Sequence, residues 1–491
     1  MVPARPNLLG KLSATELAHL IQQRETSSVE LIDDFFARCE RVNPSVNAIV
    51  AIDPAVARNE AVRSDARALR RERLSPLDGI PVTVKDNIFV AGFRATWGSR
   101  LFEGFSPPCD DIAIARLRSA GANLLAKTNT PEFALAAHTD NLLFGPTRNP
   151  WDLNLTPGGS SGGAVAALAV GLAPLAIGTD AGGSIRRPAS YAGVVGFRPS
   201  TGRIPRAFGF PALAHDFQVV APAARTVDDT YLLFRTMAGP DMRDRASLCF
   251  ADYPLPESLA HVPLPKLRIR CVFGIDNAPV DKEVRDNVEA AAKTLASLGH
   301  CVDEGLPPYE LDAVERVWSI LSTAGLARVV TRQHDWSARV HPASRAAAER
   351  GLAVSAQEYV NALDATQELR LMLATFFEKV DFLLMPTSAS LPWVIGKPYP
   401  EVIAGREAGS RGAALFATFV NVAGLPAVSV PVAPSAGGIP IGMQLVGPFG
   451  GDLLLLRLAR EFEQAAPWAA RFPPLAERLI VQPIDKQIQI T

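Results

Sequence analysis

Three short segments of the chain carry side chains that could together hydrolyse an amide or ester bond. An apolar strand predicted over residues 80–84 ends at Lys85, where burial would disfavour the ammonium form and leave an amine that can act as a base. Ser160 lies in a glycine-rich loop, and Ser184 follows a run of small residues. A serine hydroxyl needs a base to become nucleophilic, and no histidine lies in or beside either loop. Lys85 is therefore the candidate base of a Ser–Lys set.

The run of small residues before Ser184 predicts a site that can stabilise an oxyanion. Consecutive small residues leave several backbone N–H groups able to converge on one point, as an oxyanion hole requires. Asp180 and Arg186 flank this run and are predicted to pair and hold the loop closed. The glycines around Ser160 allow positive φ angles, and the alanine-rich helix predicted after them adds a helix N-terminus.

Each segment taken alone also has another interpretation. A lysine at a strand end often reaches for solvent, and a Gly-Gly-Ser turn is usually structural. A phosphate-binding loop would need a lysine after its last glycine, but Gly163 is followed by Ala164. Residues 158–162 also fit the G-x-S-x-G pattern of an α/β-hydrolase esterase, which needs an acid and a histidine downstream. That interpretation leaves Lys85 and Ser184 without a role.

Strands and helices are predicted to alternate along the chain, which favours an α/β layered architecture. Strands are predicted over residues 80–84, 123–125, 175–178, 194–197, 267–273, 382–385 and 427–432. Helices are predicted over residues 112–119, 162–170, 281–298, 413–422 and 452–464, and a helical stretch over about 309–380 is expected to form part of the substrate wall. The pattern resumes after a proline-rich connection at residues 254–265, so we expect one domain.

Composition limits the classes of function. Of the 491 residues 48% are hydrophobic and 20% charged, which supports a large core. The 49 basic residues form no block that could follow a phosphate backbone, so a nucleic-acid partner is not expected. Five scattered cysteines predict reduced thiols and a cytoplasmic location, and seven histidines show no metal-ligand spacing. An uncharged stretch at residues 156–179 is interrupted by glycines and prolines, so we expect a buried helix there and no membrane span.

Taken together, the three segments resemble those of the amidase signature family. They read G-I-P-V-T-V-K-D-N at residues 79–87, G-G-S-S-G-G at residues 158–163 and G-T-D-A-G-G-S-I-R-R-P-A at residues 178–189. Further similar segments are residues 127–133, 145–151, 193–199, 421–427 and 442–444, so the resemblance spans nearly the whole chain. Ala192 stands where the family often has a cysteine, at a position that we interpret as a packing site.

The resemblance implies a role for each residue of the site. Ser184 matches the nucleophile, Ser160 the bridging serine held by a cis peptide, and Lys85 the base. The groups that match the oxyanion hole are the backbone N–H groups of Ala181, Gly182, Gly183 and Ser184. The resemblance also implies one α/β domain over residues 1–491, with a signature core over about 75–220, a mixed sheet covered by helices on both faces, and no metal or organic cofactor.

These roles predict an amidase that cleaves the C–N bond of a small-molecule carboxylic acid amide through an acyl-enzyme on Ser184. The residues expected near the pocket are Phe133, His138 and Phe144, with the helical stretch over residues 318–326. Their aromatic and aliphatic character favours an apolar or aryl acyl group.

The alternative within the family is the glutamine-hydrolysing A-subunit of an aminoacyl-tRNA amidotransferase. Such a protein recognises glutamine through an acidic residue on the helix before the segment at residues 421–427, where this chain has Ala414. A free-standing amidase is therefore the preferred interpretation. A homodimer is one option for the oligomeric state, and no interface is indicated by the sequence.

Overall fold

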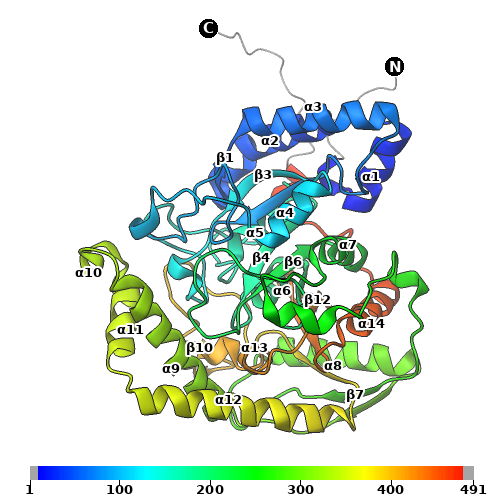
Figure 1. Ribbon diagram of the computed structural model, residues 1–491. Helices are drawn as coiled ribbons and strands as arrows, with labels where there is room; N and C mark the ends of the chain where they lie inside the picture. The colour runs from blue at the N-terminus through cyan, green and yellow to red at the C-terminus, as the bar shows by residue number, and fades with distance from the viewer. Residues whose placement is uncertain (1–8, 479–491) are drawn as a thin grey trace.

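The computed structural model describes residues 9–478, and an eleven-stranded sheet runs through its centre (Figure 1). The strands lie in the order β1-β3-β2-β4-β6-β5-β12-β13-β9-β7-β8. β2 is parallel to β3 and β4, β7 is parallel to β8 and β9, and the other pairs are antiparallel. In that order the bounds are Ile49–Ile52, Asn123–Thr128, Pro81–Lys85, Leu175–Asp180, Val219–Ala224, Val195–Arg198, Ala427–Pro431, Gly442–Val446, Phe382–Pro386, Arg268–Cys271 and Cys301–Glu304. A separate ribbon pairs β10, Val402–Ile403, with β11, Arg406–Glu407.

The α-helices α1 to α15 follow in chain order. Their bounds are Ala14–Gln23, Ser28–Val46, Pro54–Arg70, Ile112–Ser119, Gly162–Ala169, Arg186–Ala192, Val227–Met237, Lys282–Ser297, Leu311–Val330, Trp336–Arg339, Pro342–Leu352, Ala356–Phe377, Thr418–Ala423, Asp452–Ala465 and Pro474–Arg478. Short 3-10 helices η1 to η6 span Leu9–Lys11, Arg100–Phe102, Glu132–Ala134, Arg245–Phe250, Leu259–His261 and Gly412–Ala414. In Figure 1, α1–α3 lie at the end of the molecule that carries β1 and β3, and α9–α12 form a layer at the opposite end.

Helices cover both faces of the sheet because its central strands are apolar on both sides. Successive side chains of a strand point to opposite faces. In β4, Leu175 and Ile177 belong to the core shared with α7 and α14, whereas Ala176 belongs to the core shared with α5 and α6. This arrangement confirms the predicted fold class, a mixed α/β sheet covered by helices on both faces.

The structure corrects the helix predicted over residues 413–422. The chain forms the 3-10 turn η6 there, and α13 begins only at Thr418. The carbonyl oxygens of Phe416 and Ala417 accept hydrogen bonds from the side chains of Gln444 and Arg186. Because those carbonyls bond to side chains of β13 and α6, the helix does not continue through them.

Four strands of the sheet, β1, β6, β8 and β13, were not predicted from the sequence. β6 is central, and its Pro222 pairs with Ile177 of β4. Proline cannot donate a hydrogen bond to a neighbouring strand, so the sequence argues against a central strand at that place. β6 nevertheless borders β4 along its full length, up to Asp180. It thereby positions the strand end that carries the candidate site.

Candidate active site

Lys85, the last residue of β2, lies fully buried among hydroxyl groups (0% exposed). Its Nζ is 2.7 Å from Ser160 Oγ, 3.0 Å from Ser161 Oγ and 3.0 Å from Thr179 Oγ1. Burial lowers the pKa of Lys85 well below its ordinary value, and the charge of Asp180 opposes this only in part. With no carboxylate in ion-pair contact among the described residues, the neutral amine is the favoured form.

Proton counting around Lys85 indicates the direction of each hydrogen bond. A neutral amine has two N–H donors and one lone pair, but three hydroxyl oxygens surround Nζ. Thr179 Oγ1 also accepts from Asn87 Nδ2 (3.1 Å), and the Ser161 hydroxyl can donate to the Thr179 carbonyl (3.2 Å). The amine can therefore donate to Ser161 and Thr179 while its lone pair accepts the Ser160 proton. This is the orientation that a base needs.

Three members of the site, Asn87, Ser161 and Thr179, were missed by the sequence analysis. Each lies close to a residue that was identified: Asn87 follows Lys85 by two positions, Ser161 follows Ser160, and Thr179 precedes Asp180. Asn87 and Thr179 come together because β2 and β4 are adjacent parallel strands that both end at this edge, and Ser161 joins them from the N-terminus of α5.

A second buried lysine, Lys127 of β3, is not placed to act as this base. It pairs in register with Val84, one residue from Lys85, so its side chain points to the opposite face of the sheet. Its Nζ donates to the Ile88 carbonyl (2.5 Å). Burial lowers the pKa of Lys127 to about 8, and the charge of Asp86 opposes the shift.

Ser160 and Ser184 line one cavity. The Gly159–Ser160 peptide bond is cis, and Ser160 is fully buried, whereas Ser184 keeps 7% of its surface exposed. Among the described residues the two hydroxyls form no hydrogen bond with each other, although the Ser161 N–H donates to the Ser184 carbonyl (3.0 Å). Proton transfer from Ser184 to Ser160 therefore stays a prediction.

The loop between β4 and α6 presents its backbone N–H groups toward the same place. Gly183 has φ +94°, and a Cβ on it would lie 2.6 Å from the Ala417 Cβ, so only glycine fits. The Gly183 N–H, one of the four predicted oxyanion donors, already donates to Asp180 Oδ1 (2.8 Å). The N–H groups of Ala181, Gly182 and Ser184 have no hydrogen-bond partner among the described residues and are the donors left for an oxyanion.

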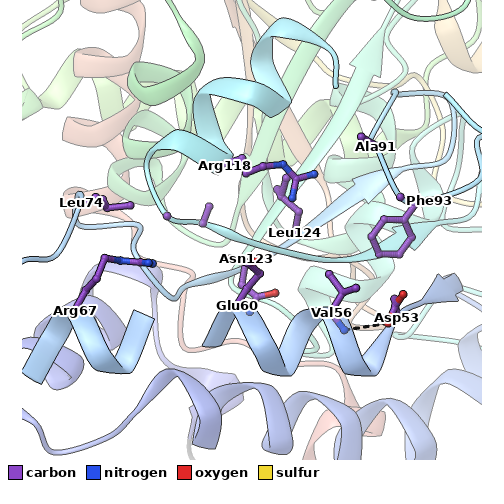
Figure 2. A pocket seen from close by; sticks show the side chains of 13 residues that line it. Asp53, Val56, Glu60, Arg67, Leu74, Ala91, Phe93, Arg118, Asn123 and Leu124 are labelled. Atoms are coloured by element: carbon purple, nitrogen blue, oxygen red, sulfur yellow. Dashed lines mark hydrogen bonds between the residues drawn. The ribbon is translucent and has the colours of Figure 1, made fainter. Parts of the chain in front are cut away.

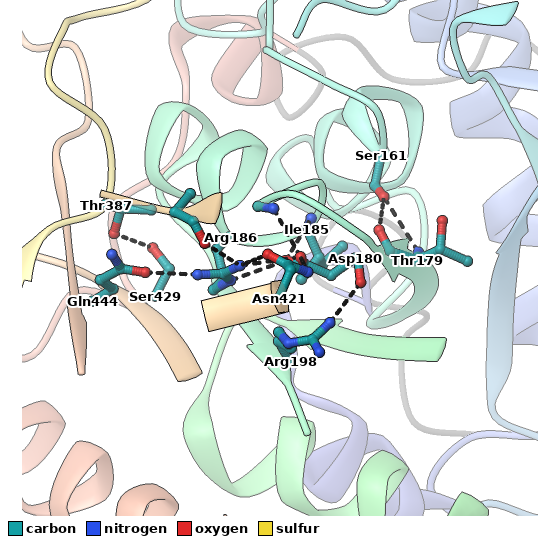
Figure 3. A network of polar contacts seen from close by, with 12 residues as sticks. Ser161, Thr179, Asp180, Ile185, Arg186, Arg198, Thr387, Asn421, Ser429 and Gln444 are labelled. Atoms are coloured by element: carbon teal, nitrogen blue, oxygen red, sulfur yellow. Dashed lines mark hydrogen bonds and ion pairs between the residues drawn. The ribbon is translucent and has the colours of Figure 1, made fainter. Parts of the chain in front are cut away.

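A buried ionic cluster anchors this loop (Figure 3). Arg186 Nε donates to Asp180 Oδ2 (3.0 Å), which is the pairing predicted from the sequence. Arg186 also donates to Asn421 Oδ1 (2.6 Å) of α13 and to Gln444 Oε1 (2.9 Å) of β13. Burial alone would raise the pKa of Asp180, but the charges of Arg186 and Arg198 outweigh it and hold that pKa well below the usual range. The cluster thus joins the loop to strands and helices more than 230 residues away.

Of the three residues predicted near the pocket, one lines the cavity. Phe133 lines the cavity, but His138 and Phe144 do not. His138 Nδ1 lies 3.2 Å from the Pro398 carbonyl, and the Phe144 carbonyl accepts a hydrogen bond from Asn47 (2.7 Å).

The cavity wall comes mainly from the predicted segments, with one addition at residues 213–218. Trp318 of the predicted stretch lines it, whereas Leu321 and Leu326 are buried in separate cores. A Cβ on Gly182 would lie 3.1 Å from Cη2 of Trp318, so this ring packs directly on the loop. The other lining residues are Ala134, Leu135, Thr179, Ala181, Leu213, Ala214 and Gln218.

A second cavity lies between α3 and β3 (Figure 2). Its charged side chains are held by neighbours: Arg67 pairs with Asp78 (2.6 Å) and Arg118 with Asp110 (2.8 Å). Asp53 caps the N-terminus of α3. Because its polar groups are already engaged, this cavity is not a candidate for the chemistry.

Within residues 9–478, no group of three or more His, Cys, Asp or Glu side chains is placed to hold a metal ion. No helix of that part of the chain has the length and apolar character needed to cross a membrane.

The Amidase family model matches residues 30–456. The chain belongs to the amidase signature family. The chain is 36% identical over 479 residues to the A-subunit of the glutamyl-tRNA(Gln) amidotransferase of Picosynechococcus sp., a match that covers 92% of this chain and 97% of that one.

Two solved structures show the same fold. A bacterial aryl acylamidase of the amidase signature family superposes on this chain with a TM-score of 0.86 at 26% identity, covering 96% of this chain and 99% of that one. The A-subunit of the glutamyl-tRNA(Gln) amidotransferase of Thermotoga maritima superposes with a TM-score of 0.75 at 25% identity, covering 95% and 97%. The chain is therefore an enzyme that hydrolyses carbon–nitrogen bonds.

Proposed function

We propose that the enzyme hydrolyses carboxylic acid amides through an acyl-enzyme on Ser184, with Lys85 as base and Ser160 as relay. The observation that carries this proposal is the placement of a buried amine 2.7 Å from Ser160 Oγ, with Ser160 and Ser184 lining one cavity. A lysine with no carboxylate partner is neutral there and can accept a proton.

The mechanism follows from these positions. Lys85 takes the proton of Ser160, which takes that of Ser184 as its oxygen attacks the amide carbon. The N–H groups of Ala181, Gly182 and Ser184 stabilise the oxyanion. The proton returns through Ser160 to the leaving nitrogen, and water then repeats the sequence on the acyl-enzyme.

This mechanism has a defined pH dependence. Only unprotonated Lys85 can act, and burial lowers its pKa. Activity should therefore rise with pH as Lys85 loses its proton and then level off. An activity independent of pH from acid to mildly alkaline conditions would contradict the role of Lys85.

For the acyl group we propose an apolar or aryl moiety. Phe133, Leu135, Leu213 and Trp318 line the cavity around the two serines. Apolar walls with few polar groups favour an apolar ligand part. The fold similarity to an aryl acylamidase supports the same choice.

A second candidate function is glutamine hydrolysis as the A-subunit of an aminoacyl-tRNA amidotransferase. The curated relatives favour it, because they carry that name at 36% identity over nearly the whole chain. Against it, Ala414 is buried in η6 and offers no acidic side chain to a glutamine ammonium group. Under this candidate the enzyme would act with partner proteins. In either case we propose a reducing, cytoplasmic location, since all five cysteines are unpaired.

Ammonia release from a panel of primary amides separates the two candidates. The panel contains aliphatic, aryl and arylacetyl amides and glutamine, each tested with the wild type and with Ser184→Ala. Turnover of apolar amides but not of glutamine, abolished in the variant, supports a free-standing amidase. Turnover of glutamine alone supports the amidotransferase role, and apolar-amide turnover that survives Ser184→Ala refutes the catalytic assignment.

A further inference from the structure

Arg187, next to the catalytic loop, is a buried guanidinium without a partner. It retains only 5% exposure, and its Nε and Nη1 are enclosed with no hydrogen-bond acceptor among the described residues. A buried polar group without a partner costs free energy, and a charged one costs more. An arginine in this state inside a folded core needs an explanation, and a bound anion is one that matches its charge.

The position of Arg187 ties it to the reacting centre. Its N–H donates to the Gly183 carbonyl (3.0 Å). Its Nε lies 3.1 Å from the place that a Cβ on Gly183 would take, while Ala417 closes the other side. The guanidinium thus lies against the loop that ends in Ser184, on the α13 side of that loop.

No nearby carboxylate can neutralise Arg187. Asp180 is already bound by Arg186, Asn421 and the Gly183 N–H. The charges of Arg411 and Arg186 disfavour that of Arg187. Each of these two has its own carboxylate partner, Glu315 and Asp180, and Arg411 lies over the Trp318 ring. Burial lowers the pKa of Arg187 to about 10, so the guanidinium stays charged at neutral pH.

We propose that Arg187 binds a carboxylate of the substrate, so that the amides this enzyme prefers carry an acid group close to the scissile bond. This rests on the proposed amidase function and deepens it: an apolar part occupies the cavity at Phe133 and Trp318, and the acid lies across the loop at Arg187. The planar fork of arginine fits a carboxylate through two parallel hydrogen bonds. Ala414 supplies no acid for an ammonium group, so an acid without a free amine is the matching class.

The test compares matched pairs of amides that differ only in the acid. Succinamate against butyramide places the carboxylate on the acyl fragment, and phenylacetylglycine against N-propyl phenylacetamide places it on the amine fragment. The ratio of kcat/KM within a pair does not depend on the fraction of active enzyme. In the wild type we expect one acid to exceed its neutral partner by about tenfold or more, as charge-assisted hydrogen bonds provide.

Arg187→Met should reduce that ratio to about one while leaving the neutral amide within a few-fold of the wild type. Arg225→Met is the matched control, because Arg225 has the same 5% exposure and a pKa that burial lowers to about 10, but lies at the end of β6 against Leu12 and Phe472. It should leave the ratio unchanged. Arg187→Lys, which keeps the charge without the fork, should give an intermediate ratio.

Competitive inhibition of the wild type by succinate, with butyrate as control, tests the same site without a variant. Preferential inhibition by the diacid supports the proposal even where Arg187→Met fails to fold. Neutral amides hydrolysed as well as the acids, or an acid preference that survives Arg187→Met, would overturn it. If the wild type hydrolyses none of the four amides, the proposed function fails instead.

Discussion

Replacement of Thr179 by valine tests the claim that hydroxyl groups hold Lys85 as a neutral base. The substitution preserves shape but removes the oxygen that accepts from Lys85 Nζ (3.0 Å) and from Asn87 Nδ2 (3.1 Å). Two buried donors would then lack an acceptor, at a cost of about 1–3 kcal/mol each and so about 2–6 kcal/mol in the free energy of unfolding. The plateau of kcat/KM should fall about 10- to 100-fold, because Lys85 is no longer aligned with Ser160.

The pH dependence of kcat/KM gives a second measurement, which would not change if Thr179 only supported the fold. An accepted hydrogen bond stabilises the ammonium form of Lys85 more than the amine, so its loss lowers the pKa of Lys85 further. Since activity needs the amine, the acidic limb of kcat/KM should move to lower pH. The profile is measured on a primary amide, and stability by urea unfolding.

Thr83→Val is the matched control for Thr179→Val. Thr83 lies on β2, two residues before Lys85, and its Oγ1 is buried without a hydrogen-bond partner among the described residues. Removing that oxygen should leave the pH profile unchanged and leave stability equal or slightly higher. A Thr179→Val enzyme with the wild-type plateau and acidic limb would refute the account of Lys85.

Three further variants follow from the same geometry. Lys85→Met should abolish hydrolysis. The pKa of Lys85 is lower in the folded than in the unfolded state, so between these two pKa values the unfolded state binds more protons and wild-type stability should rise with pH. Urea unfolding of the variant should not show this rise. Gly182→Ala should lower kcat/KM because its Cβ presses on Trp318 at 3.1 Å, and adding Trp318→Ala should restore part of the loss; no restoration would mean that the loop fails for another reason. Asp180→Asn should lower the free energy of unfolding by about 3–5 kcal/mol, seen as a lower thermal midpoint, because Arg186 keeps a buried charge with no counterion; an unchanged midpoint would contradict the anchoring role of the cluster.

The pairing of Lys85 with serines could be predicted from the sequence for a local reason. The two glycine-rich loops and the strand-end lysine are each contiguous, and their residue types limit the chemistry whatever the fold around them. The alternation of strands and helices likewise predicted the layered α/β sheet, since hydrophobic periodicity is encoded within each segment. The same periodicity could not reveal β6, because the burial of Pro222 in a central strand is decided by the neighbours of that strand.

Which residues line the cavity was decided by the tertiary structure alone, because it depends on contacts between segments far apart in the sequence. His138 and Phe144 are near the catalytic segments in sequence, yet neither lines the cavity, and they make hydrogen bonds with Pro398 and Asn47. Leu213 enters the cavity from a segment that shows no sign of it. Local sequence specifies which groups can do chemistry, whereas packing between residues hundreds of positions apart specifies the charge state, the free donors and the shape of the site.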